Sequence, residues 1–201
     1  MVEGSGKYEL VAEHRSSHGP NVVQVRGSLI ASSLETIRQL DLFDRYIGHL
    51  PPQHHDQIVY VIAASWVPIE DAMAHYAACD AMQLTEPELH EIGGYVSKRI
   101  MGTFLGTLMR TAGSVIAPGS ALKHYPRLWD RLLVGGGCSV SMMGKKDARI
   151  ESRGVPMFRF RYFRIAYTGL IRGAAQVFGE HVNTRIRNVT DNSLTIDLQW
   201  V

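Results

Sequence analysis

The sequence predicts an α+β fold in which helices pack on an antiparallel sheet. Three patterns in its last third lead to this prediction. Apolar residues recur at steps of three and four over residues 158–178, which is typical of a helix with a buried stripe. Residues 138–142 and 149–153 alternate in polarity around a short turn, and residues 194–200 alternate in the same way. Because each element needs an apolar partner, we expect two hairpins to form a four-stranded sheet that the helix covers.

The N-terminal region carries two strand patterns before its first helix. KYELVAEH and NVVQVRG are separated by the polar segment RSSHGP, so residues 1–24 are expected to form either a hairpin or an N-terminal arm. One helix is expected from residue 28 to just before residue 41, and a short one from residue 41 to about residue 50, which Pro51 and Pro52 end. Another short helix is expected within residues 53–62.

Two further helices have recognisable start signals. Pro68 precedes two acidic residues and is expected to begin a helix to residue 82, since proline suits a first turn and acids complement the helix dipole there. Thr85 and Glu88 form a capping box for a long helix over residues 86–111. A helix through residues 120–132 then ends at three glycines. Residues 25–134 are therefore expected to be mainly helical, and residues 135–201 to form a hairpin, a helix and a second hairpin.

The long helix contains four interior glycines, Gly93, Gly94, Gly102 and Gly106. Each costs about 1 kcal/mol relative to alanine, so we expect something to approach the helix backbone closely. Another helix is the usual cause. A subunit interface or a ligand lying against the groove is the alternative.

Composition bounds the class of protein. A chain of 201 residues, 45% hydrophobic and 20% charged, fits a single globular domain over residues 1–201. Residues 145–187 hold ten Lys or Arg against three acids, but the net charge is only +2. We interpret this stretch as a solvated face, because no aromatic-rich nucleic-acid signature accompanies it. No run of about 18 apolar residues indicates a membrane span, so a cytoplasmic protein without a membrane or nucleic-acid partner is expected.

The two cysteines, Cys79 and Cys138, have no paired spacing, which argues against a disulfide framework or a thiolate metal site. Cys138 as a nucleophile would need a base that the sequence does not locate, so we interpret it as a small buried strand residue. No metal ligand set is predicted.

Several short motifs resemble a bacterial domain family that is expanded in myxobacteria. They are VRGS at residues 25–28, LPP at 50–52, WVP at 66–68, YPRLW at 125–129, RGVP at 153–156 and the closing Trp200. This family is in turn similar to the superfamily of vinyl-4-reductase-type, heme-nitric-oxide-associated and Bet3-like domains, to which phenol-sensing activator domains also belong. The resemblance implies a helix-and-sheet domain, commonly dimeric, with an apolar pocket between its helices and sheet. The zinc-binding cysteines of the phenol sensors have no counterpart in the last hairpin.

A pocket of this kind is mostly apolar, with a few polar groups that orient the ligand. Each candidate residue can also be a packed core residue, and Arg164 can also form an ordinary ion pair. The candidate ligand-binding residues are Trp66, His75, Tyr76, Met101, Phe104, Trp129, Arg164 and Tyr167.

We therefore expect a non-enzymatic, homodimeric sensor domain that holds a small apolar or aromatic molecule between its helices and sheet. A ligand-free dimerisation or protein-interaction module is the alternative. A heme sensor with a single axial histidine, such as His75 or His124, is the least favoured of the three, because one histidine leaves no spacing pattern. No cofactor is required by the sequence.

Overall fold

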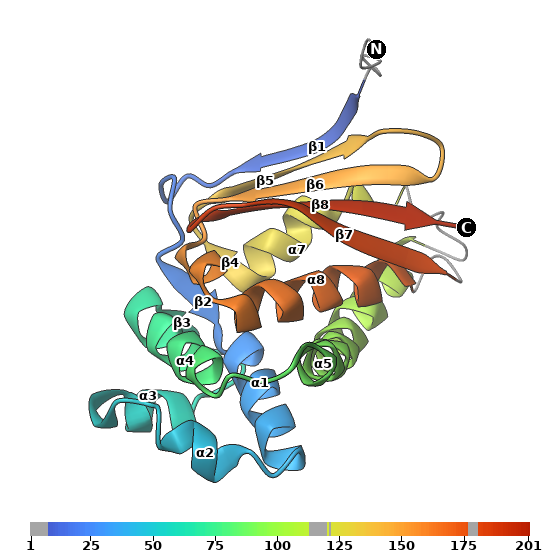
Figure 1. Ribbon diagram of the computed structural model, residues 1–201. Helices are drawn as coiled ribbons and strands as arrows, with labels where there is room; N and C mark the ends of the chain where they lie inside the picture. The colour runs from blue at the N-terminus through green and yellow to red at the C-terminus, as the bar shows by residue number, and fades with distance from the viewer. Residues whose placement is uncertain (1–7, 113–119, 121, 177–180) are drawn as a thin grey trace.

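The computed structural model describes residues 8–112, 120, 122–176 and 181–201, with side chains for all of these except residues 100–112. A five-stranded antiparallel sheet lies along one side of the molecule, and helices pack beneath it (Figure 1). Its strands, in spatial order, are β1 (Glu9–Arg15), β5 (Gly137–Met142), β6 (Asp147–Arg153), β8 (Ser193–Trp200) and β7 (Val182–Val189). The two predicted hairpins, β5–β6 and β7–β8, are confirmed and share this one sheet.

The N-terminal strands do not form a hairpin with each other, so that expectation was wrong. β1 instead pairs with β5, with His14 opposite Cys138, and adds a fifth strand to the predicted four. β2 (Gln24–Arg26) lies in a second sheet, between β3 (Trp66–Pro68) and β4 (Leu133–Val134). The segment between β1 and β2 crosses from one sheet to the other, and this crossing separates the two strands.

Glycines make that crossing possible. Gly135 and Gly154 have φ of +96° and +75°, values that side chains rarely adopt. A Cβ at Gly135 would lie 2.1 Å from the carbonyl oxygen of Asn21, and one at Gly154 would lie 1.9 Å from that of Pro20. The crossing segment is also hydrogen-bonded here, from the amide of Val22 to the carbonyl of Gly154 at 2.7 Å.

The helices follow the predicted order, with shifted ends. Helix α5 begins at the predicted residue, and the carboxylate of Glu88 accepts bonds from the amide and hydroxyl of Thr85 at 2.7 and 2.6 Å. The final helix begins three residues later than expected, because Pro156 starts a 3₁₀ turn and Phe160 is extended. The helices are α1 (Gly27–Gln39), α2 (Phe43–Ile47), η1 (Pro52–His54), α3 (His55–Val59), α4 (Ile69–Ala81), α5 (Glu86–Ala112), α7 (Tyr125–Leu132), η2 (Pro156–Arg159) and α8 (Arg161–Gln176).

The two faces of the large sheet differ in chemistry. Alternate residues of β5, β6 and β8 point toward the helices and are buried, including Val140, Ile150 and Ile196. The opposite face is polar, and there Asp197 accepts hydrogen bonds from Arg149 at 2.7 and 3.2 Å and from Arg187 at 2.5 Å. Two residues of the basic stretch, Arg149 and Arg187, are therefore ion-paired within the sheet. No helix in the described part of the chain is long and apolar enough to cross a membrane.

Candidate functional site

The centre of the molecule is α8, which lies between the sheet and α5 (Figure 1). From Tyr162 to Ile171 nearly every residue of this helix is buried. A helix that packs through a single apolar stripe would bury only one side. α5 crosses α8 where glycines of the two helices meet. A Cβ at Gly169 would lie 3.1 Å from the Cα of Gly93, so the two backbones are almost in contact. For Gly93, the close approach that the sequence predicted is therefore that of another helix.

A small internal cavity lies beside this crossing, between α1, α4, α5 and α8. Its volume is about 20 Å³, which is room for one water molecule. Its walls are largely aromatic, and the rings of Tyr76 and Phe163 meet edge to face with centroids 4.6 Å apart. The lining residues are Leu29, Ser33, Tyr76, Val96, Tyr162, Phe163, Ala166, Tyr167 and Leu170.

A chain of buried hydrogen bonds runs outward from the cavity wall. The hydroxyls of Tyr162 and Ser33 are 2.7 Å apart, and the Ser33 hydroxyl is 3.0 Å from Nε2 of His75. Nδ1 of His75 is 2.7 Å from the hydroxyl of Tyr46, and the thiol of Cys79 lies 3.7 Å from Nε2. The chain links α8, α1, α4 and α2, and both ring nitrogens of His75 are engaged in it.

Burial keeps this chain uncharged. It lowers the pKa of His75 from its ordinary 6.5 to about 3, so the imidazole is neutral at physiological pH. Burial likewise raises the pKa of Tyr46, Tyr162 and Cys79 well above their ordinary values. The site is therefore a set of neutral donors and acceptors rather than an acid–base pair.

A second group of hydroxyls lies at the other end of the cavity. The hydroxyl of Tyr167 is 2.8 Å from that of Ser152 on β6 and is also hydrogen-bonded to that of Tyr125 on α7. These contacts tie α8 directly to the sheet and to α7. The cavity is thus an apolar space bordered by the Ser33–Tyr162 hydroxyl pair, and at about 20 Å³ it would admit a molecule larger than water only if its walls moved.

Three of the eight candidate residues lie at this site. Tyr76 and Tyr167 line the cavity, and His75 supports Ser33 from behind the wall. Met101 and Phe104 lie on α5, but their side chains are outside the described residues. Their place in the site stays a prediction.

The other three candidates lie elsewhere, and each has a structural partner. Trp66 is half-buried in the small sheet, with the guanidinium of Arg26 4.6 Å from its ring. Nε1 of Trp129 donates to the carbonyl of Gly135 at 3.1 Å. Nη1 of Arg164 donates to the carbonyls of Phe158 and Arg159 in the turn before α8, at 2.7 and 2.9 Å.

Ser33, Tyr162 and Ala166 are cavity residues that the sequence did not reveal. One signal was present, since Tyr162 and Ala166 lie eight and four residues before Leu170, a member of the recognised stripe, and so extend the apolar surface to one side of it. A surface extended in this way indicates a helix buried on more than one side. Nothing in the sequence distinguishes Ser33 from the polar residues around it.

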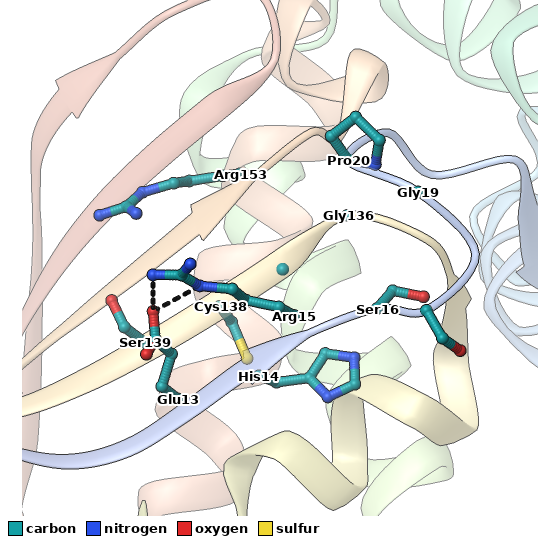
Figure 2. A pocket seen from close by; sticks show the side chains of 12 residues that line it. Glu13, His14, Arg15, Ser16, Gly19, Pro20, Gly136, Cys138, Ser139 and Arg153 are labelled. Carbon is teal, nitrogen blue, oxygen red and sulfur yellow. Dashed lines mark hydrogen bonds and ion pairs between the residues drawn. The ribbon is translucent and has the colours of Figure 1, made fainter.

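Cys138 was considered as a nucleophile, and a histidine does lie opposite it in the sheet. Nε2 of His14 is 3.2 Å from a carboxylate oxygen of Asp130 on α7. However, burial raises the pKa of the Cys138 thiol to about 12, which keeps it protonated. A groove of about 400 Å³ runs past both residues, and Figure 2 shows that Arg15 beside them is paired with Glu13. Among the described residues, no group of three or more His, Cys, Asp or Glu side chains could hold a metal ion.

Comparison with known proteins gives matches by structure only. No family model matches the sequence, and no curated protein matches it. An oxygen-binding H-NOX domain related to soluble guanylate cyclases superposes with a TM-score of 0.55 at 15% identity, covering 87% of this chain and 94% of its own. An H-NOX protein solved to probe heme distortion gives 0.55 at 13%, covering 87% and 94%. A single-residue mutant of the T. tengcongensis H-NOX gives 0.51 at 13%, covering 87% and 97%.

These matches define the class of protein as an α+β domain with helices packed on an antiparallel sheet. More particularly, the chain has the fold of H-NOX domains. This agrees with the heme-nitric-oxide-associated branch of the resemblance found in the sequence. The narrower resemblance to the myxobacterial family stays a prediction.

Proposed function

We propose that this chain is a non-enzymatic sensor domain that binds a small apolar or aromatic molecule in the cavity between α1, α4, α5 and α8. The observation that supports it most is the cavity itself, whose aromatic walls meet the Ser33–Tyr162 hydroxyl pair. A binding site needs both features, since apolar walls provide affinity and the polar pair fixes orientation. The H-NOX fold supports a role as a ligand-binding domain, because the similar structures include an oxygen-binding one.

The signal would arise from how the helices pack around the ligand. The cavity is bounded by four helices, and its wall is bonded through His75 to Tyr46 on α2. A molecule that fits one arrangement of α5 and α8 better than another shifts the population toward it, by no more than the difference between the two affinities. The hydrogen-bond chain from Tyr162 to Tyr46 would transmit this change in helix packing to α2.

Heme is the ligand that the H-NOX comparisons point to, so its fit to this chain must be considered. A heme iron is held by a protein ligand such as histidine. Both nitrogens of His75 are already hydrogen-bonded, to Tyr46 and to Ser33. The other axial candidate, His124, lies at the start of α7 and is not in the cavity lining. The described residues therefore do not fit a heme, and we propose a heme-free domain.

Extraction of freshly purified protein tests both parts of this proposal. Denaturing the chain in organic solvent and analysing the extract by mass spectrometry is expected to release one small apolar or aromatic compound in near-stoichiometric amount. A visible absorption spectrum of the same sample is expected to show no porphyrin band. Stoichiometric heme in the extract would contradict the heme-free proposal. An extract that contains neither kind of molecule would contradict a tightly held ligand.

The ligand-free interaction module is the competing function. The face of α5 at Gly93 is taken up by α8 of the same chain and is not available to a partner. The homodimer, the cytoplasmic location and the lack of catalysis remain proposals. Light scattering tests the first of these, with one chain per particle as the contradicting result.

A further inference from the structure

A second pocket opens at the surface next to the internal cavity. It lies where α4, the turn into α5 and the start of α8 meet, and it has a volume of about 200 Å³. Its lining is partly charged, with Asp80 and Arg161 among its residues. Cys79 and Tyr162 lie at its inner end and are both almost fully buried.

Tyr162 belongs to both spaces. Among the described residues it is the one that lines both the internal cavity and the surface pocket, so it lies between them. Its backbone is fixed, because its amide donates to the carboxylate of Asp80 at 2.8 Å. The hydroxyl at the far end of its ring is bonded to Ser33 at 2.7 Å and to the thiol of Cys79.

We infer that Tyr162 is a gate, and that rotation of its ring joins the surface pocket to the internal cavity and forms the binding site in its open state. The inference rests on the proposed function and gives it an entry route. The closed cavity has room for one water molecule, whereas the two spaces and the volume vacated by the ring together approach the roughly 300 Å³ at which small-molecule pockets begin.

The joined site indicates the chemical class of its ligand. Its inner part is walled by Leu29, Val96 and Phe163 and suits an apolar or aromatic body. Its outer part, beside Arg161 and Asp80, suits a polar end. A small molecule with an aromatic ring and one hydroxyl or similar group matches both parts, and the hydroxyl of Ser33, freed by rotation of Tyr162, becomes a partner for it.

Cys79 provides a readout of the gate that requires no ligand. The chain has two cysteines, so a Cys138→Ala background leaves Cys79 as a single thiol at the inner end of the surface pocket. Its alkylation by N-ethylmaleimide measures how often the pocket opens. Tyr162→Phe keeps the ring but removes the hydroxyl that bonds Ser33 and Cys79, and it is expected to raise the rate at least about fivefold, the factor that matches one neutral hydrogen bond. Tyr162→Ala removes the ring and is expected to raise it more than tenfold.

The direction of the change in alkylation rate distinguishes opening of the pocket from a change in the reactivity of the Cys79 thiol. The hydroxyls of Ser33 and Tyr162 counteract the effect of burial on the pKa of Cys79, so removing one of them without opening the pocket would make the thiol less reactive. Tyr46→Phe is the matched control, because it removes a hydroxyl bond at the other end of the same chain but leaves the gate intact. It is expected to change the rate by less than twofold. Low concentrations of urea are expected to leave every alkylation rate nearly constant, because a local opening exposes little additional surface.

Two results would overturn the gate. One is alkylation of the Tyr162→Phe variant at or below the parent rate, and the other is equal acceleration by Tyr46→Phe. Circular dichroism and the thermal midpoint of each variant establish that it is folded.

Benzyl alcohol, a ring with one hydroxyl, is the probe for binding. The Tyr162 variants could be alkylated faster while benzyl alcohol fails to raise the thermal midpoint. That result would support the gate and contradict only the proposed function.

Discussion

Replacement of Gly169 by leucine is expected to destabilise the chain by about 3 kcal/mol or to prevent folding. A Cβ at this position would lie 3.1 Å from two backbone atoms of Gly93, and neither atom can move without displacing α5. Overpacking of this kind costs about 1–3 kcal/mol even where side chains can adjust. Because the obstacle here is backbone, the cost is expected at the upper end. Urea unfolding followed by circular dichroism measures it.

Gly94→Ala is the matched control for that experiment. Gly94 is next in sequence to Gly93 on the same helix, but a Cβ there would meet nothing within 4 Å. Alanine is expected to stabilise the chain by up to about 1 kcal/mol, because glycine is the poorer helix former. Destabilisation by both substitutions to the same extent would show that the α5–α8 crossing is not as close as described.

The second large effect concerns His75 and pH. This histidine is fully buried and neutral, with its pKa lowered by burial from 6.5 to about 3. The unfolded chain takes up a proton near pH 6.5, whereas the folded chain does not until about pH 3. The stability that follows from a neutral His75 is therefore complete above pH 6.5 and is lost as the pH falls through this window. One proton corresponds to about 1.4 kcal/mol per pH unit, which gives a loss of about 2 kcal/mol between pH 6.5 and pH 5.

His75→Gln is expected to remove this pH dependence, since glutamine retains hydrogen-bonding groups but does not titrate. Unfolding free energies measured by urea at pH 7, 6 and 5 test it, with the difference between parent and variant shrinking toward pH 5. His90→Gln makes the same substitution at a partly exposed histidine on α5 and is the matched variant for comparison. A parent and a His75→Gln variant with parallel pH profiles would refute the account of a buried neutral histidine.

Local patterns in the sequence were sufficient to predict much of this fold. The alternation in β5, β6 and β8 and the bond from the Thr85 amide back to Glu88 depend on neighbours in sequence, and they appear in the structure where expected. The other half of the predicted capping box does not form as expected, because the Thr85 hydroxyl donates to the Glu88 carboxylate. The pairing of β1 with β5 could not be predicted, because the alternation of a single strand does not specify its partner. The same limit applies to β2 and its small sheet.

The site was predicted less well than the fold, for two physical reasons. Buried polar residues such as Ser33 and His75 look like surface residues until their partners on other helices are known. The close crossing of α5 and α8 depends on glycines in both helices, and only those in α5 were recognised. Gly169 and Gly173 are four residues apart on α8, a spacing that allows a neighbouring helix to approach along one face.

The central claim is that the cavity beside the α5–α8 crossing binds a small molecule, and thermal unfolding with benzyl alcohol tests it most directly. Val96 lines the cavity from α5, so Val96→Phe fills the space, and the midpoint of this variant without ligand shows whether it folds. A ligand at 100 times its dissociation constant stabilises by about 2.7 kcal/mol. The account predicts a midpoint that rises with benzyl alcohol concentration in the parent and stays constant in Val96→Phe. A parent midpoint that does not rise, or an equal rise in both proteins, would contradict it.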